Sequence, residues 1–429
     1  MKLALLDQSF HWPPTGGSWV DLRETAIRLQ AHGITPKIFT PERKCEQIPA
    51  GRLNADPGIP VETIPIRPTQ FNFYSLPRIL EQRVRAWKPD AIMIGDTFYL
   101  GPHLIRRFPD IPVFLRMYAH ELACLNYMSL CRVDTFKWEA QNPHASICGG
   151  SLMKTPFMCW KCGLRRLGGT LIGPRLNPVA TEYWTALAWT PWYARVVRQS
   201  LNSLKGIIVY NPFIKDLLKS IDSPIYVVPG GIDSSRFSPR CEPKTSGPIR
   251  ILFPGRLDDP RKGYRSFRDC IQILKNRGFT FEALVTDSRV TGSDDLVHST
   301  GWVPWENLPA LYQSVDIVVC PSIWPEPFGI TALEAMASGL PVVASCIGGF
   351  QYTVVDGKTG LHFSPGNAQE MADRLETLIR DADLRQRLGI AGRERVLAHF
   401  DWDIIVARYT SRIFKGELSI DTNPWITDQ

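Results

Sequence analysis

The stretch 321–337 holds the residues best placed to carry chemistry. Glu326 and Glu334 are its two acids, and between them Gly329 permits a sharp turn before a helix that we expect to begin near Ile330. Exposed N–H groups at the start of that helix would attract an anion. The two carboxylates could therefore face one ligand that also presents an anion to the helix start, although a capped helix with two surface acids has the same pattern.

A second anion-binding element precedes it at 253–263. Gly255 and Arg256 follow an apolar run that we expect to be a strand, and open α/β sheets bind ligands at the carboxyl ends of their strands. Arg256 offers a planar fork of donors and Lys262 a mobile ammonium, so together they could neutralise a pyrophosphate. A solvated basic loop has the same composition, but the expected helix start lies at the same edge of the same sheet, which favours one shared anion site.

Short apolar runs alternate with helix-period segments, which predicts α/β domains whose parallel sheets are covered on both faces. The runs expected to be strands are 3–6, 37–40, 91–95, 113–116, 206–210, 225–228, 251–253, 281–285, 317–320 and 341–344. A stretch rich in Pro and Gly at 236–248 predicts a linker. We expect a first domain at 1–240 with a Cys-rich insertion at about 121–170, a second at 246–400, and a returning helix and tail at 401–429. Two such domains would face one another across a cleft and hold a ligand between them.

The composition is ordinary for a soluble globular protein, with 44% hydrophobic and 21% charged residues among 429. No apolar run approaches the ~18–20 residues of a membrane span, and the run before Asp7 is too short for a secretory segment, so we expect a cytoplasmic protein. Ten cysteines are too few for a secreted disulfide scaffold. The net charge of +7 is concentrated between Ser151 and Lys205, where there are eight basic residues and one acid. Such a local patch argues against a protein that coats nucleic acid.

Further motifs surround the two anion-binding elements. They are Pro229-Gly230-Gly231-Ile232-Asp233 with Phe237 and Pro239, Gly339-Leu340-Pro341-Val342-Val343-Ala344, Gly348-Gly349, and Asp356-Gly357-Lys358-Thr359-Gly360-Leu361. Together with the two elements, they resemble the retaining glycosyltransferases of the GT-B fold, in the large family that includes sucrose synthases and bacterial mannosyl- and glucosyltransferases. The hallmark of that family is two Glu separated by seven residues, as Glu326 and Glu334 are. The resemblance implies two Rossmann-like domains and transfer of a sugar from a nucleotide-diphospho-sugar with retention of anomeric configuration.

The resemblance also implies a role for individual residues. Arg256 and Lys262 would hold the donor diphosphate and stabilise the leaving group. Glu326 would face the donor sugar, and Glu334 would bind the ribose hydroxyls of the nucleotide. The other residues that would contact the donor are Phe328, Gly329, Ile330 and Thr331 through their backbone, His120 beside the sugar, and Gly16 and Gly17 near the diphosphate and acceptor.

Two segments depart from the family's pattern. The family usually has a glycine-rich turn where this chain has Thr286-Asp287-Ser288, and it usually has a Glu a few residues after the position of Gly348-Gly349, where this chain has Phe350-Gln351-Tyr352. Donor choice is therefore not fixed by the resemblance. A UDP-sugar is expected because such donors are the commonest in the family.

Charge that develops on a diphosphate can be stabilised by Arg256, Lys262 and the helix start, so we expect no metal in catalysis. Asp258-Asp259 is adjacent and lies in the basic loop, which makes it a poor metal site. A nucleotide-sugar epimerase of the same fold and a non-catalytic nucleotide-sugar-binding protein are the alternatives. A dinucleotide oxidoreductase is disfavoured because Asp7 to Gly17 contains no Gly-x-Gly-x-x-Gly.

A cluster of cysteines is the chain's own feature. Its members are Cys124, Cys131, Cys148, Cys159 and Cys162. The two-residue gap of the last pair is that of zinc sites, and thiolate–zinc bonds persist in a reducing compartment. We expect a structural zinc held by Cys148, Cys159, Cys162 and either Cys124 or Cys131, with His144 a weaker candidate; disulfides and unlinked thiols are the alternatives.

The segment 181–198 mixes aromatic and basic residues. They are Tyr183, Trp184, Trp189, Trp192, Tyr193, Arg195 and Arg198. Such a mixture suits a membrane interface or an acceptor that bears phosphate, whereas a helix that packs its aromatics inward has the same content. The acceptor could be a glycan, a lipid-linked molecule or a small molecule, and the protein could lie at the inner face of the membrane.

Overall fold

The computed structural model describes residues 1–14, 16–42, 51–120, 122, 178–241, 247–257, 259–287 and 296–410. These residues form two compact units. The first unit holds the described residues up to Val228 together with 406–410, and the second runs from Pro229 to Ile405. Within the described ranges no helix combines the length and the apolar character that a membrane span requires.

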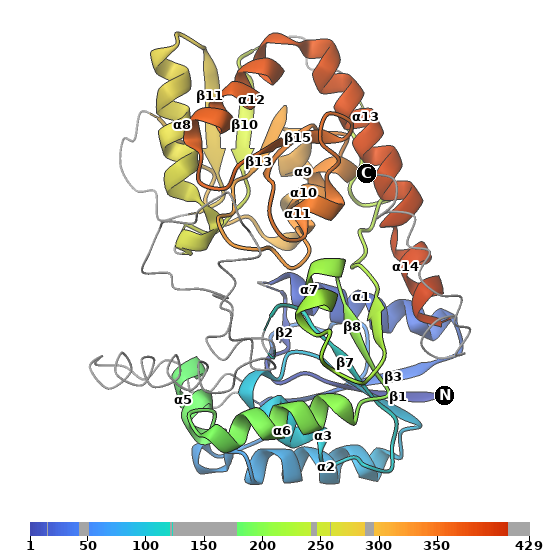
Figure 1. Cartoon of the computed structure of the whole chain (residues 1–429). Helices are drawn as coiled ribbons and strands as arrows, with labels where there is room; N and C mark the ends of the chain where they lie inside the picture. Colours follow the sequence, from blue (N-terminus) through green and yellow to red (C-terminus); the bar gives the residue numbers. More distant parts are fainter. Residues whose placement is uncertain are drawn as a thin grey trace. The chain divides into compact units, whose positions relative to one another are not determined.

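The first unit is built on a seven-stranded parallel sheet in the order β5-β3-β1-β6-β7-β8-β9 (Figure 1). Its strands are β1 (Lys2–Leu6), β3 (Thr35–Glu42), β5 (Val61–Pro65), β6 (Ala91–Ile94), β7 (Val113–Arg116), β8 (Gly206–Val209) and β9 (Ile225–Val227), while β2 (His11–Trp12) and β4 (Arg52–Leu53) form a separate pair. Its helices are α1 (Gly17–Ala31), α2 (Ser75–Trp87), α3 (Gly101–Ile105), α5 (Pro178–Thr185), α6 (Pro191–Asn202) and α7 (Pro212–Leu217), with 3-10 turns η1 (Pro68–Gln70) and η2 (Phe98–Leu100). Every residue of β6, β7 and β8 is buried, as expected of parallel strands covered on both faces.

The second unit is built on a six-stranded parallel sheet in the order β12-β11-β10-β13-β14-β15. Its strands are β10 (Ile249–Phe253), β11 (Phe281–Val285), β12 (His298–Ser299), β13 (Ile317–Cys320), β14 (Val342–Ser345) and β15 (Gly360–Phe363). Its helices are α8 (Tyr264–Asn276), α9 (Leu308–Gln313), α10 (Ile330–Ala337), α11 (Phe350–Thr353), α12 (Ala368–Arg380) and α13 (Ala382–His399), with η3 (Pro260–Lys262) and η4 (Trp305–Asn307). The last described helix, α14 (Trp402–Arg408), begins in the second unit and ends in the first.

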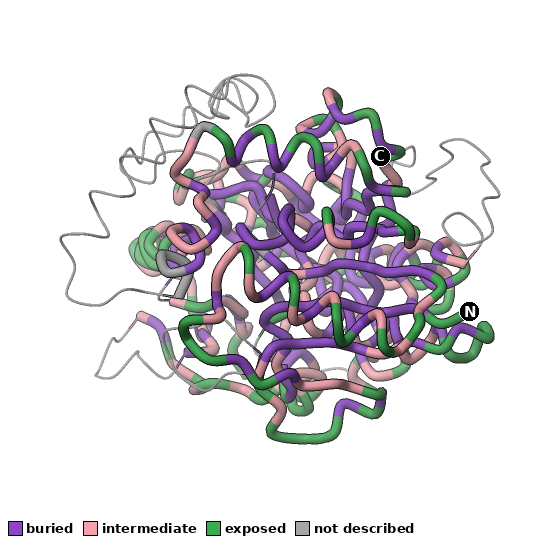
Figure 2. The backbone as a smooth tube through the Cα atoms, turned by 90° about the horizontal axis from the view of Figure 1, so that it is seen from below, coloured by how far each residue is buried: buried purple, intermediate pink, exposed green. Residues whose placement is uncertain are grey.

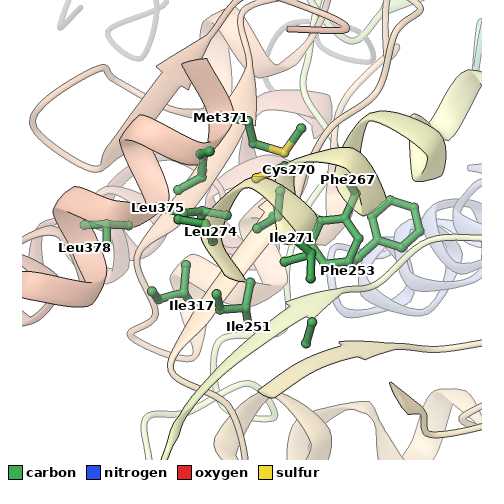
Figure 3. Close-up of a cluster of buried hydrophobic side chains, with 14 of the residues drawn as sticks. Ile251, Phe253, Phe267, Cys270, Ile271, Leu274, Ile317, Met371, Leu375 and Leu378 are labelled. Atoms are coloured by element: carbon green, nitrogen blue, oxygen red, sulfur yellow. The ribbon is translucent and has the colours of Figure 1, made fainter. Parts of the chain in front are cut away.

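The core of the second unit lies where α8 and α12 cover one face of the sheet (Figure 3). Phe267, Ile271 and Leu274 recur along α8 at the spacing of one helix face, and all three are buried. They meet Ile251 and Phe253 of β10 in the same cluster. Figure 2 colours the described residues by burial, and the strands of both sheets are mostly buried.

In both units the sheet has a switch point beside its first long strand. β1 lies between β3 and β6, and β10 lies between β11 and β13. The register pairs Ile251 with Ile317 and Leu252 with Val318, so β10 and β13 end at the same edge. This edge is where open parallel sheets bind ligands, and the segments 254–263 and 321–329 both start there.

The predicted fold class, two Rossmann-like α/β domains, is confirmed. The predicted strands 113–116, 281–285 and 317–320 have the observed bounds, and the other predicted strands differ by one or two residues at one or both ends. The returning helix expected within 401–429 begins at Trp402. A cleft between the domains stays a prediction, and almost all of the expected Cys-rich insertion lies outside the described residues.

Arg116, the last residue of β7, is fully buried and joins several segments of the first unit. Its guanidinium donates to both carboxylate oxygens of Asp21 on α1, each at 3.3 Å, and to the backbone oxygen of Val228 at 2.6 Å. It also lies over the rings of Tyr210 and Tyr409, at 4.1 and 5.6 Å from the ring centroids. A buried cation requires such partners, so Arg116 ties α1 and the returning residue 409 to the sheet edge.

Asp21→Ala should lower the free energy of unfolding by about 3–5 kcal/mol, because it leaves the Arg116 guanidinium buried without its counter-charge. Urea denaturation of the purified chain measures this. Arg83→Ala is the matched control, since Arg83 is 56% exposed where it pairs with Glu62, and exposed pairs contribute little. An equal effect of the two substitutions would contradict the role given to Asp21.

Candidate functional site

Lys262, at the end of η3, and Glu326, in the loop before α10, form an ion pair with Nζ and Oε1 2.6 Å apart. Glu326 is only 7% exposed. The same carboxylate oxygen accepts hydrogen bonds from the Ser322 hydroxyl at 2.6 Å and from the Trp324 indole N–H at 3.1 Å. The segments after β10 and β13, which are 64 residues apart at this pair, therefore meet on one oxygen atom.

The pKa of Glu326 reflects two opposed effects. Burial disfavours the charged carboxylate, but the Lys262 ammonium and the hydrogen bonds from Lys262, Ser322 and Trp324 outweigh burial and hold the pKa below its ordinary value. Glu326 is therefore ionised at neutral pH. Among the described residues no donor reaches its other oxygen, Oε2, which leaves that oxygen available to a ligand hydroxyl.

Two glycines allow the backbone to close around this pair. Gly263 has φ +79°, and a Cβ there would collide with the backbone oxygen of Pro321, so η3 lies against the start of the loop after β13. Gly348 has φ +57°, and a Cβ there would collide with the backbone of Glu326. Both positions combine a left-handed backbone with close approach, which a side chain would prevent.

Arg256 and Arg261 occupy the basic loop in different ways. Arg261 is bound by Asp259 at 2.7 Å and lies over the Trp324 ring, 4.8 Å from its centroid. The Arg256 side chain is 54% exposed, and its nearest carboxylate oxygen, on Asp259, is 3.9 Å away. Arg261 is thus committed to holding the loop, whereas Arg256 remains free to turn toward an anionic ligand.

Asp287 explains one departure of the sequence from the family pattern. It follows β11, is 4% exposed, and its Oδ2 accepts a hydrogen bond from the backbone N–H of Leu257 at 3.0 Å. The polar residue that replaces a glycine-rich turn therefore anchors the loop that carries Arg256.

Glu334 lies in the second turn of α10 and is 6% exposed. Its Oε2 accepts a hydrogen bond from the Tyr312 hydroxyl on α9 at 2.9 Å. Burial raises the pKa of Glu334 to about 7, although the Tyr312 hydrogen bond and the charge of Arg236 act in the opposite direction. Arg236 lies over the Trp305 ring, 3.3 Å from its centroid. The two carboxylates of the loop and helix thus differ in protonation because their surroundings differ.

The start of α10 adds backbone donors to the same region. Gly329 caps the helix with φ +86°, and Ile330 and Thr331 are its first two residues. Phe328 is 7% exposed and packs near Phe400, with 6.2 Å between ring centroids. The first N–H groups of a helix have no partner within it, so they can face an anion.

Three candidate residues lie in the first unit. His120 follows β7, is fully buried, and its ring meets Phe213 edge-on with 5.8 Å between centroids. Gly16 is the N-cap of α1 and Gly17 its first residue, and both are exposed. In the second unit the structure brings Lys262 and Glu326 together, and Glu334 lies one helix turn beyond the start of α10. His120, Gly16 and Gly17 belong to the first unit.

Sequence reasoning missed several residues of the site. Tyr312 precedes β13 by five residues, and Arg236 lies in the segment interpreted as the linker, so neither stood in a motif. Trp324 and Ser322 stand inside the motif around Glu326, and their closeness in sequence was a usable signal. In the sequence, Asp287 marks only the place where the glycine-rich turn of the family is absent.

The predicted zinc ligands Cys124, Cys148, Cys159 and Cys162 lie outside the described residues, as do the fourth-ligand alternative Cys131 and the candidate His144. Across the part of the chain that the structure describes, no group of three or more His, Cys, Asp or Glu side chains gathers as a metal site would require. The described Cys241, Cys270, Cys320 and Cys346 are free thiols. The structural zinc stays a prediction.

Residues 281–395 match the family model "Glycosyl transferases group 1". This segment contains Glu326, Glu334 and α10. Among curated proteins, the phosphatidyl-myo-inositol mannosyltransferase of Mycobacterium leprae is 28% identical over 51% of this chain. The chain spans 59% of the length of that relative. The match confirms the resemblance for residues 281–395, the part of the second unit that holds Glu326 and Glu334.

Solved structures match over almost the whole chain. Sucrose-phosphate synthase from Thermosynechococcus elongatus has a TM-score of 0.66 and 20% identity, and the match covers 97% of this chain and 98% of that one. HepE of Anabaena, in complex with UDP-glucose, has a TM-score of 0.64 and 17% identity, with 97% and 100% covered. At these identities the likeness shows the fold, which is that of GT-B glycosyltransferase structures.

The stability of the chain should depend on pH through Glu334. The pKa of Glu334 in the folded chain is about 7, above its ordinary 4.5. The contribution of protonated Glu334 to the free energy of unfolding is therefore complete below pH 4.5 and is lost as the pH rises through 7. The loss amounts to roughly 3 kcal/mol. In urea denaturation at pH 4.5 to 7.5, Glu334→Gln should lack this decline, and Tyr312→Phe should extend it to higher pH. A parallel decline in wild type and Glu334→Gln would contradict the assignment.

Proposed function

We propose that this chain, which carries a glycosyl transferases group 1 domain at 281–395, is a retaining glycosyltransferase that moves a sugar from a nucleotide-diphospho-sugar to an acceptor hydroxyl. The observation that carries this proposal is the Lys262–Glu326 ion pair at the carboxyl edge of the second sheet. It supplies an ammonium, a carboxylate with an available oxygen, and, four residues on, the start of α10. A sugar diphosphate presents the complementary hydroxyls and phosphates.

The diphosphate leaving group needs positive charge. In the proposed reaction the bond from the anomeric carbon to the diphosphate oxygen breaks, a bond to the acceptor oxygen forms, and the acceptor's proton passes to the leaving phosphate. Lys262, Arg256 and the N–H groups at Ile330 and Thr331 would stabilise the charge that grows on the diphosphate. The exposed Arg256 side chain can turn toward a phosphate. We therefore propose that catalysis requires no metal.

Glu326 would face the sugar. Ser322 and Trp324 continue to hold Oε1 when the Lys262 ammonium turns to a phosphate, so the carboxylate keeps its place. Oε2 can then accept a hydrogen bond from a sugar hydroxyl. A fixed anion beside the anomeric carbon would also stabilise positive charge that develops there as the bond breaks.

Glu334 would bind the ribose hydroxyls of the nucleotide. It lies one helix turn beyond the start of α10, so a nucleotide whose phosphates meet the helix start has its ribose within reach of this carboxylate. Tyr312 orients Oε2, which leaves Oε1 for the ligand. Two ribose hydroxyls would compensate the burial that raises its pKa.

The first unit would supply the remaining contacts to the donor and would bind the acceptor. His120 would lie near the donor sugar, and Gly16 and Gly17 near the diphosphate and acceptor. We propose UDP as the nucleotide, supported by the UDP-glucose complex of the structural neighbour HepE. The acceptor is proposed as a glycan, a lipid-linked molecule or a small molecule.

We also place the enzyme in the cytoplasm. We propose a structural zinc on the cysteine cluster, which elemental analysis of chelator-free protein would detect.

A panel of nucleotide sugars tests the function. One UDP-sugar should raise the melting temperature of the purified chain, because a ligand that binds only the native state stabilises it. NMR of the product formed with that donor should show the anomeric configuration of the donor retained. Conversion of the donor sugar to its epimer without acceptor, or neither transfer nor hydrolysis of any donor, would overturn the proposal.

Arg256→Ala and Lys262→Ala should each reduce kcat/KM by about 2–4 kcal/mol of transition-state stabilisation, or roughly 30- to 1,000-fold. The reason is the loss of a cation beside the leaving diphosphate. Arg265→Ala, at an exposed position on α8, removes the same charge nearby and should leave kcat/KM unchanged. Steady-state kinetics of donor hydrolysis or transfer measures both. Near-normal turnover in the double Arg256/Lys262 variant would refute the leaving-group role.

Glu326 and Glu334 should differ in kinetic signature. Glu326→Gln should lower kcat with little change in donor KM, since it removes charge that acts in the transition state. Glu334→Gln should raise donor KM with little change in kcat, because a ribose contact is made equally before and during the reaction. Donor saturation curves of the two variants decide this, and the reverse pattern would exchange the two roles.

A further inference from the structure

The outer face of α6 combines an exposed tryptophan with two exposed arginines. Trp192 is 41% exposed, and Arg195 and Arg198 follow it at the spacing of one helix face, both exposed. Tyr193, Val196 and Val197, on the opposite side, are buried. The helix therefore packs its inner side into the unit, whereas Trp192, Arg195 and Arg198 on its outer side are exposed.

Trp192 packs on Phe73, whose neighbour in sequence is a second exposed aromatic residue. Its ring meets Phe73 with 6.4 Å between centroids, and the next residue, Tyr74, is 57% exposed. Arg78 on α2, also exposed, donates to the Tyr74 hydroxyl at 3.5 Å. We call Tyr74, Arg78, Trp192, Arg195 and Arg198 the α6 face. Helix α3 packs against both α2 and α6, which fixes these residues on one unit (Figure 1).

The two arginines of α6 have no acid beside them in the part of the chain that the structure describes. In the described ranges neither Arg195 nor Arg198 has a carboxylate within ion-pair distance, whereas Arg85 and Arg107 of the same unit are paired with acids. The one acid between residues 178 and 205 is Glu182, and it is fully buried.

A shallow hollow adjoins the two arginines. Its volume is about 490 Å³, and its lining residues are Arg195, Arg198, Gln199, Asn202 and Ser203. These side chains offer guanidinium, amide and hydroxyl donors, which suit a phosphate. Asn202 also donates to Asp222 at 2.6 Å, so the acid at this end of the helix is already engaged.

We infer that the α6 face docks the protein on an anionic lipid bilayer. Arginines placed at the surface attract phosphate headgroups, and indole and phenol rings are favoured at the depth of the headgroups because one end of each is apolar and the other polar. We assign a lipid surface as the partner because the exposed rings and cations of the α6 face alternate from the start of α2 to α6, two helices that both pack on α3. Docking through this face is independent of the donor chemistry at Glu326.

Vesicle flotation tests the proposal with the full chain. Vesicles of phosphatidylcholine with phosphatidylglycerol should carry the protein at low salt, and pure phosphatidylcholine vesicles should not. Arg195→Gln/Arg198→Gln should weaken binding about thirtyfold, from ~1 kcal/mol for each basic residue near an anionic surface. Added salt should reduce binding of the wild type, because salt screens exposed charges.

The matched control is Lys358→Gln/Arg387→Gln, which removes the same charge from exposed positions of the second unit. It should bind as wild type does. An equal loss in both double variants would show attraction by net charge alone and would overturn the α6 face as the docking site. Unchanged binding of Arg195→Gln/Arg198→Gln, or no binding of wild type to anionic vesicles, would also overturn it. Unchanged donor hydrolysis in both variants separates this result from the proposed function.

Brominated lipids give a second readout. Vesicles that carry bromine on the acyl chain near the headgroup should quench part of the tryptophan fluorescence of bound wild type. Trp192→Phe keeps a ring against Phe73 and should lose that part of the quenching. Quenching that is the same in both proteins would place Trp192 away from the lipid and contradict the proposed orientation.

Discussion

A carboxylate stays ionised in a buried loop only if cations and donors replace the water that it loses. At Glu326 the replacements are the Lys262 ammonium, the Ser322 hydroxyl and the Trp324 indole, and all three converge on one oxygen. This convergence requires η3 and the loop after β13 to lie against one another. The glycines and hydrogen bonds at this edge of the second sheet either permit the contact between η3 and the loop or support the segments that make it.

The backbone permits the contact at a few positions. Gly263 and Gly348 let two chains approach where a Cβ would collide, and the Ser345 hydroxyl donates to the backbone oxygen of Ser322 at 2.7 Å. Asp287 holds the far side of the basic loop through Leu257. These contacts hold both ends of the basic loop, and the Arg256 side chain is exposed.

The same physics separates the two acids of the region and holds the first unit. Glu326 has a cation within 2.6 Å and a pKa below its ordinary value, whereas Glu334 has a phenol and a pKa of about 7. Glu326 is therefore ionised at neutral pH. Glu334, in contrast, depends on a ligand for further hydrogen bonds to its carboxylate. In the first unit, Arg116 is buried with Asp21 in a comparable way, but there the pair joins α1 to the sheet.

The sequence by itself determined the elements and the main site residues. Apolar runs located the strands that end at residues 116, 285 and 320, because buried parallel strands are apolar throughout. Gly329 identified the helix start between Glu326 and Glu334. Only the tertiary structure decided that Lys262 binds Glu326, that Tyr312 binds Glu334, and that Trp192 is exposed while Tyr193 is buried. Periodicity is a local property, whereas these contacts depend on which strands a parallel sheet makes neighbours and on how its helices are turned.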